Sequence, residues 1–151
     1  QAGEFFHDHY QSIHLEKLSP FPGAAEMLAE IAADGIYLGV VSNKKGAFLR
    51  REAEYLGWDG YFGKLVGAND AENDKPAPDP VHLALSAGPV QAGPGVWFVG
   101  DADIDMECAL NAGCVPVLLR EQAPCGNEFD SKKPVYHLME CQELGKLLKS
   151  L

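Results

Sequence analysis

The stretch VWFVGDADID, residues 96–105, indicates the fold of this chain more clearly than any other. Its first half is a short, β-rich apolar run, which is typical of a buried strand. Residues 106–113 have a helical pattern, and Gly113 is a helix stop. The acids Asp101, Asp103 and Asp105 therefore lie where a strand ends and a helix begins. In open α/β sheets, ligands bind at that place.

Three carboxylates this close together repel one another. A Mg²⁺ ion relieves the repulsion, since proteins hold it with one or two carboxylates, water and substrate phosphate. An alternative is that Asp103 or Asp105 is only the N-cap of the helix, which would explain one acid of the three. A calcium loop is excluded, because that loop needs Gly and Glu where this chain has Met106 and Ala112.

Length and composition restrict the class of protein. The chain has 151 residues, a size that suits one domain, and 46% of them are hydrophobic. The formal net charge of −10 argues against nucleic acid or an anionic membrane as a partner. No apolar run has the length of a membrane span, and no signal peptide is recognised. The spacing of the four cysteines fits no zinc or redox pair, which favours reduced thiols and a cytoplasmic location.

Segments with strand and helix patterns alternate along the chain. Such alternation predicts an α/β fold with a doubly wound parallel sheet. The expected strands are 37–41, 64–67, 96–99, 115–119 and 134–138, and the expected helices are 3–17, 24–34, 46–56, 81–87, 105–112 and 143–151.

Two further segments with candidate site residues follow predicted strands. Ser42 and Asn43 precede a helix, where a hydroxyl, an amide and free N–H groups suit a phosphate oxygen; alternatively, they only cap that helix. Lys75 precedes Pro76, which favours an extended backbone, and nearby prolines stiffen the segment. A lysine held there would neutralise charge in a transition state. The alternative is an ordinary solvated lysine.

The order of these segments resembles that of the haloacid dehalogenase-like (HAD) hydrolase superfamily, in its phosphoglycolate phosphatase-like branch. Ser42-Asn43 resembles the second motif, Lys75-Pro76 the third, and Gly100-Asp101 with Asp105 the fourth. Phe21-Pro22-Gly23 resembles the turn by which the chain re-enters the core from the cap. The resemblance implies a Rossmann-like core over residues 19–151 and the last helix of a helical cap over residues 1–18.

The resemblance also implies an activity and residue roles. The expected reaction is Mg²⁺-dependent hydrolysis of a small phosphorylated metabolite through an aspartyl-phosphate. Ser42 would bind the phosphoryl group, Asn43 would support that loop, and Lys75 would hold the phosphate and the nucleophile. Asp101 and Asp105 would anchor Mg²⁺, directly or through water. Ser42, Asn43, Lys75 and Asp101 are thus the expected catalytic residues, and Asp103 has no family role.

The chain departs from the family at its first motif. Asp-x-Asp-Gly-Thr, which supplies the nucleophile and the acid/base, does not occur in the 151 residues. We therefore expect a truncated chain that lacks the first core strand and does not turn over substrate. The strands on either side of that gap would have to pair, accept another segment or associate between chains.

Two other classes of function stay open at this stage. One is a non-catalytic module of the same fold that binds phosphate or Mg²⁺. The other is a receiver-type signalling domain, which would place its acidic pair after an early strand and its lysine after the last one.

Overall fold

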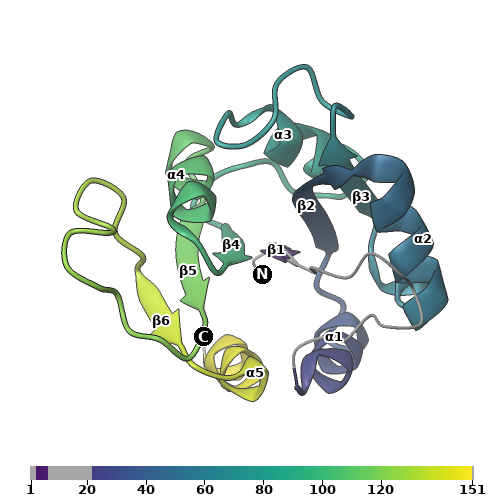
Figure 1. The fold of residues 1–151 in the computed structure, drawn as a ribbon. Helices are drawn as coiled ribbons and strands as arrows, with labels where there is room; N and C mark the ends of the chain where they lie inside the picture. Colours follow the sequence, from purple (N-terminus) through teal and green to yellow (C-terminus); the bar gives the residue numbers. More distant parts are fainter. Residues whose placement is uncertain (1–2, 7–21, 151) are drawn as a thin grey trace.

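A computed structural model describes residues 3–6 and 22–150 of the chain. Its centre is a six-stranded sheet in the order β3-β2-β1-β4-β5-β6, and every neighbouring pair is parallel (Figure 1). The predicted α/β fold with a parallel sheet is confirmed. The strands are β1 (Gly3–Phe6), β2 (Leu38–Lys45), β3 (Lys64–Ala68), β4 (Val96–Gly100), β5 (Val115–Leu119) and β6 (Tyr136–Leu138).

Helices cover both faces of this sheet. Along β4 the side chains alternate: Trp97 and Val99 pack with α1 and α5 on one face, while Val96 and Phe98 pack with α3 and α4 on the other. Helix α2 packs against β2 and β3. The helices are α1 (Ala24–Ala33), α2 (Gly46–Leu56), α3 (Asp79–Leu85), α4 (Asp103–Asn111) and α5 (Cys141–Lys149), with a short 3₁₀ turn η2 (Asp59–Tyr61).

The N-terminal segment differs from the prediction. A helix was expected from Gly3, but residues 3–6 form β1, so that prediction is wrong for them. Glu4 pairs with Leu38 of β2 and with Trp97 of β4, which places β1 in the gap expected between these strands. Two buried strands with open edges require backbone partners, and this requirement outweighs local preference. The remainder of the predicted cap helix lies outside the described residues.

Some predicted boundaries also shift. Strand β2 continues through Ser42 and Asn43 to Lys45. Helix α3 spans Asp79–Leu85, so it starts and ends two residues earlier than the predicted helix at 81–87. Helix α4 starts at Asp103 after Ala102, so neither Asp103 nor Asp105 is its N-cap.

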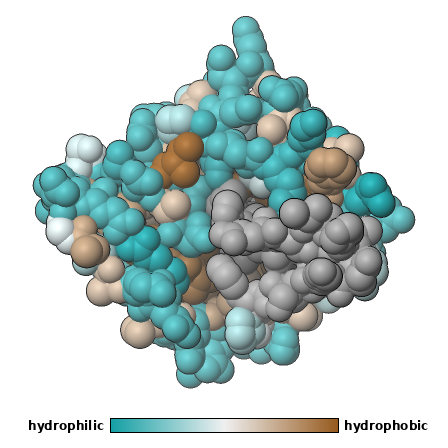
Figure 2. All heavy atoms as spheres, viewed as in Figure 1, coloured by the Kyte–Doolittle hydropathy of each residue, from teal (hydrophilic) through white to brown (hydrophobic). Residues whose placement is uncertain are grey.

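The surface is mostly hydrophilic on the face drawn in Figure 2, where apolar colour appears as separate spots. Over the described part of the chain, no helix has both the length and the apolar character needed to cross a membrane.

Candidate functional site

The carboxylate of Asp105 is the central group of the site. It lies in the first turn of α4 and is fully buried. Its Oδ1 accepts a hydrogen bond from Lys75 Nζ at 2.6 Å. Its Oδ2 accepts the N–H groups of Asp101 at 3.1 Å and Ala102 at 3.2 Å. One side chain therefore connects the lysine with the peptide that carries Asp101.

Lys75 is not a solvated lysine, because only 2% of its side chain is exposed. The alternative of an ordinary surface lysine is therefore wrong. A buried ion pair is not by itself a large source of stability, because both charges lose their hydration. Its value here is that it fixes an ammonium group at a defined position on Asp105, the same side chain that binds the backbone N–H of Asp101.

One face of α4 holds the segment that follows Lys75. Asp105, Cys108 and Asn111 are spaced three apart and so lie on the same side of the helix. Cys108 Sγ donates to the carbonyl of Ala77 at 3.4 Å, and Asn111 Nδ2 donates to the carbonyl of Pro76 at 2.9 Å. Burial raises the pKa of the Cys108 thiol to about 12, so the thiol stays protonated as a donor.

Gly100 makes room for Asp105. A Cβ at Gly100 would lie 2.4 Å from Asp105 Cβ and 2.5 Å from its Oδ2. The last residue of β4 must therefore be glycine if the carboxylate is to reach the N–H groups of Asp101 and Ala102. The Gly-Asp pair of the sequence thus has a steric explanation.

Ser42 and Asn43 lie in an irregular part of β2. Val41 pairs with Val66 and Lys45 pairs with Ala68, so three residues of β2 lie opposite Gly67 alone. Such bulges are frequent beside active sites. Ser42 is buried, and its Oγ accepts the N–H of Lys44 at 3.1 Å, whereas Asn43 is exposed.

Neither residue caps the helix that follows. The N-cap of α2 is Lys45, which makes no capping bond through its side chain. The alternative that Ser42 or Asn43 is only a helix cap is therefore wrong. Lys44 of the same bulge pairs with Glu52 of α2 at 2.6 Å, which anchors the bulge to that helix.

The described contacts join some predicted site residues and not others. Lys75, Asp101 and Asp105 form one hydrogen-bonded group. Ser42 lies at the same carboxyl end of the sheet, but β1 separates its strand from β4. Strands β2 and β4 are therefore two strand spacings apart, which is roughly 9–10 Å. Asp103 points elsewhere: its carboxylate is half-exposed and lies 3.7 Å from Lys132.

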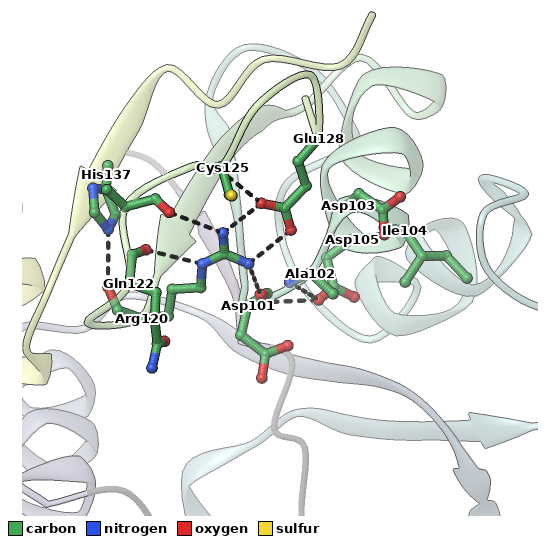
Figure 3. Close-up of polar contacts among 11 residues, drawn as sticks. Asp101, Ala102, Asp103, Ile104, Asp105, Arg120, Gln122, Cys125, Glu128 and His137 are labelled. Atoms are coloured by element: carbon green, nitrogen blue, oxygen red, sulfur yellow. Dashed lines mark hydrogen bonds and ion pairs between the residues drawn. The ribbon is translucent and has the colours of Figure 1, made fainter. Parts of the chain in front are cut away.

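Arg120 is a site residue that the sequence analysis missed. It directly follows β5, and its Nη1 donates to the carbonyl of Asp101 at 3.2 Å (Figure 3). Glu128 binds both Nη atoms, at 2.9 and 2.6 Å. This pairing lowers the pKa of Glu128 and raises that of Arg120. Arg120 directly follows an apolar strand, as Asp101 does, and this position could have indicated from the sequence that Arg120 lies at the site.

A cavity of about 780 Å³ lies beside Asp101 and Arg120. Asp101 is the only predicted site residue among those that line it. Four glutamates share its wall, so its charge favours a cation over a phosphate. These are Glu26, Glu30, Glu121 and Glu140.

The described residues could hold Mg²⁺ through the carboxylate of Asp101. Among the residues that the structure describes, no three His, Cys, Asp or Glu side chains cluster as a metal site. Mg²⁺ requires only one or two protein carboxylates when water and phosphate complete its shell. Asp101 borders the cavity and suits this task. Asp105 uses both oxygens for bonds within the protein.

Comparison with known proteins agrees with the fold. The family model described as haloacid dehalogenase-like hydrolase matches residues 1–118. Phosphoglycolate phosphatase of Escherichia coli strain K12 is 33% identical over 134 residues, which are 87% of this chain and 52% of that protein. The Yersinia pestis phosphoglycolate phosphatase is 36% identical over 115 residues, covering 76% of this chain and 49% of its own length. The chain thus spans about half the length of these curated relatives.

A solved structure gives the same result. The HAD-superfamily hydrolase from Ehrlichia chaffeensis superposes with a TM-score of 0.78 and is 26% identical. The match covers 93% of this chain and 62% of that one. By its matched family model, its relatives and its fold, the chain belongs to the haloacid dehalogenase-like hydrolase family.

Proposed function

We propose that these residues form the phosphate-binding and Mg²⁺-binding part of a phosphatase that acts on small phosphomonoesters. The observation that supports this best is the buried Lys75–Asp105 pair, which is bonded to the Asp101 peptide at the carboxyl end of a parallel sheet. Phosphoglycolate is the first substrate to test, because the curated relatives are phosphoglycolate phosphatases.

Each predicted residue has a role in this proposal. The Lys75 ammonium would offset the charge on a transferring phosphoryl group, and Ser42 would hold one of its oxygens. Asn43 would support the Ser42 loop. Asp101 would hold Mg²⁺, which when bound neutralises phosphate oxygens. Asp105 would keep Lys75 and Asp101 in place, with any contact to the metal made through water.

The motif that carries the nucleophile in this family does not occur in the 151 residues. We propose that an aspartate of an Asp-x-Asp-Gly-Thr segment attacks the phosphorus and forms the aspartyl-phosphate. That segment would end a strand between β2 and β4, the place that β1 holds here. A nucleophile there would lie between Ser42 and Asp101, in line with a phosphoryl group bound by both sides.

The test compares two chains in one assay of phosphate release. The substrates are 2-phosphoglycolate and a panel of sugar phosphates, each with Mg²⁺ and with a chelator. We expect chelator-sensitive turnover from a chain extended at its N-terminus by an Asp-x-Asp-Gly-Thr strand, and none from the 151 residues alone. Turnover by the short chain would show that the nucleophile is misplaced. A folded but inactive extended chain would reject the phosphatase.

A second candidate is a non-catalytic module of the same fold that binds phosphate or Mg²⁺. The bonds that fix Lys75 and Asp101 through Asp105 would serve such a module as well as an enzyme. The coding sequence upstream distinguishes the two, because a nucleophile motif there supports the enzyme. No disulfide joins the cysteines within the described residues, which supports the proposal of a cytoplasmic location for either candidate.

A further inference from the structure

We propose that Arg120 is a positioning residue for Asp101, holding its peptide so that the carboxylate is presented to a divalent cation. This inference deepens the proposed function and rests on it where it concerns the cation. It assigns a task to a residue outside the three motif segments, in the loop that follows β5.

The guanidinium of Arg120 is fully used. Its five N–H donors have five acceptors: Nη1 binds the Asp101 carbonyl and Glu128, Nη2 binds Glu128 and the Ala123 carbonyl at 3.5 Å, and Nε binds the Gln122 carbonyl at 3.0 Å. The group also lies 5.2 Å from the centre of the Phe129 ring. A guanidinium bound on every side has one orientation, so the bond to Asp101 has a fixed direction.

The backbone of Asp101 is consequently held at both its N–H and its carbonyl. Its N–H donates to Asp105 from α4, and its carbonyl accepts from Arg120 at the end of β5. In Figure 3 the carboxylate of Asp101 points away from the guanidinium network. Asp101 and Arg120 both line the cavity beside the site. The backbone of Asp101 therefore has a fixed position at the edge of this cavity.

Lysine cannot replace arginine in this arrangement. An ammonium is a point charge with three donors, whereas the Asp101 carbonyl and the Glu128 carboxylate are bound by a planar fork. Partners that orient a metal ligand usually contribute about 10–100-fold to metal affinity. The Arg120–Glu128 pair is partly exposed, so its loss should change global stability little. Measuring Mg²⁺ affinity and global stability together therefore distinguishes a positioning role of Arg120 from a purely structural one.

The experiment measures Mg²⁺ binding by the 151-residue chain through the amide resonances of Asp101 and Ala102. The variants are Arg120→Lys and the milder Glu128→Gln. The matched control is Lys132→Gln, which removes a cation from the same loop. Within the described part of the chain, this cation pairs with Asp103 and Glu107 of α4. Thermal unfolding of each variant is recorded in parallel, together with the carbonyl ¹³C shift and amide exchange of Asp101 without metal.

We expect Arg120→Lys to weaken Mg²⁺ binding by about 10–100-fold at nearly unchanged Tm, and Glu128→Gln to weaken it less. Lys132→Gln should bind as the wild type does. Wild-type affinity in Arg120→Lys, or an equal loss in Lys132→Gln, would overturn the proposal.

The metal-free measurements separate this proposal from the proposed function. If Mg²⁺ shifts no resonance of Asp101 or Ala102 in the wild type, the assignment of Asp101 as a metal ligand fails. A changed Asp101 carbonyl shift with faster amide exchange in Arg120→Lys would then still support positioning by Arg120. An unchanged carbonyl shift and exchange rate would reject it.

Discussion

The carboxylate of Asp105 binds three donors that come from two distant parts of the chain. Lys75 belongs to the loop before α3, and the N–H groups of Asp101 and Ala102 follow β4. The site depends on this side chain more than on the acids beside it in sequence. Asp103, two residues earlier, is half-exposed and contacts Lys132 instead.

Asp105→Asn should therefore be strongly destabilising. The substitution keeps the shape but removes the carboxylate charge that pairs with the buried Lys75 ammonium, and breaking a buried ion pair costs about 3–5 kcal/mol. Urea denaturation measures this loss. Asp103→Asn is the matched control, with an expected change below about 1 kcal/mol. Equal effects of the two variants would contradict the role given to Asp105.

Gly100→Ala should act on the same carboxylate through sterics. The added methyl would meet Asp105 at 2.4 Å, so that side chain or the backbone must move. We expect a loss of about 1–3 kcal/mol and a changed amide shift at Asp101. Gly95→Ala is the control, since nothing lies within 4 Å of its added Cβ. An Asp101 amide shift unchanged in Gly100→Ala would exclude the proposed contact.

Residue types and their order predict candidate positions for the site, but not how these residues are bonded to one another. The prolines around Lys75 predict a stiff segment, and Lys75 is indeed fixed. Its burial depends on Asp105, which is 30 residues away in sequence. Arg120 was missed for a related reason, because its bond to Asp101 spans 19 residues and no local pattern announces it.

At the scale of elements, strand and helix patterns predict most of the sheet and its helical layers. Gly57 and Gly113 end α2 and α4 with φ of +75° and +74°, as their positions predict. Errors occur where pairing is non-local. The extension of β2 to Lys45 depends on β3, and β1 depends on partners about 34 and 93 residues away, judged from the Glu4 register.

The loop after β5 should respond to acid through Glu128. Its ordinary pKa of 4.5 is lowered in the folded protein, mainly by the hydrogen bond from Arg120. A lowered pKa means that the carboxylate stabilises the fold above pH 4.5 and that this contribution is lost as pH falls through the folded pKa. The difference in unfolding free energy between wild type and Glu128→Gln should thus shrink between pH 6 and pH 3. If this difference in unfolding free energy grew on acidification, the pKa of Glu128 would not be lowered by folding.

At the scale of the whole molecule, the site lies across the centre of the sheet. Ser42 lies near the carboxyl end of β2, one neighbour of β1, and Asp101 follows β4, the other neighbour. Strand β1 has only four residues, yet within the described sheet it is the backbone connection between the β2–β3 and β4–β6 sides. The spacing between the two sides of the site is therefore set by a short segment.

Phe5→Pro tests this arrangement through the backbone. Phe5 pairs with Gly39 and with Phe98, and proline removes its N–H from a strand paired on both sides. We expect a loss of about 1–3 kcal/mol and faster amide exchange in β2 and β4. Phe5→Val keeps the N–H and serves as control.

Sedimentation of the Phe5→Pro variant adds a second result, since strand edges opened by the substitution should promote association between chains. Unchanged exchange in β2 and β4 would show that β1 does not pair with them in solution.

The shared carboxylate of Asp105 has a thermodynamic consequence. An anion that draws on Lys75 and a cation that draws on Asp101 both act on the bonds of one side chain. If a bound cation changes the affinity for the anion by some factor, the bound anion must change the affinity for the cation by the same factor. Under the proposed function, a substrate phosphate and a metal ion would thus be reciprocal effectors, and the affinity for either would depend on whether the other is bound.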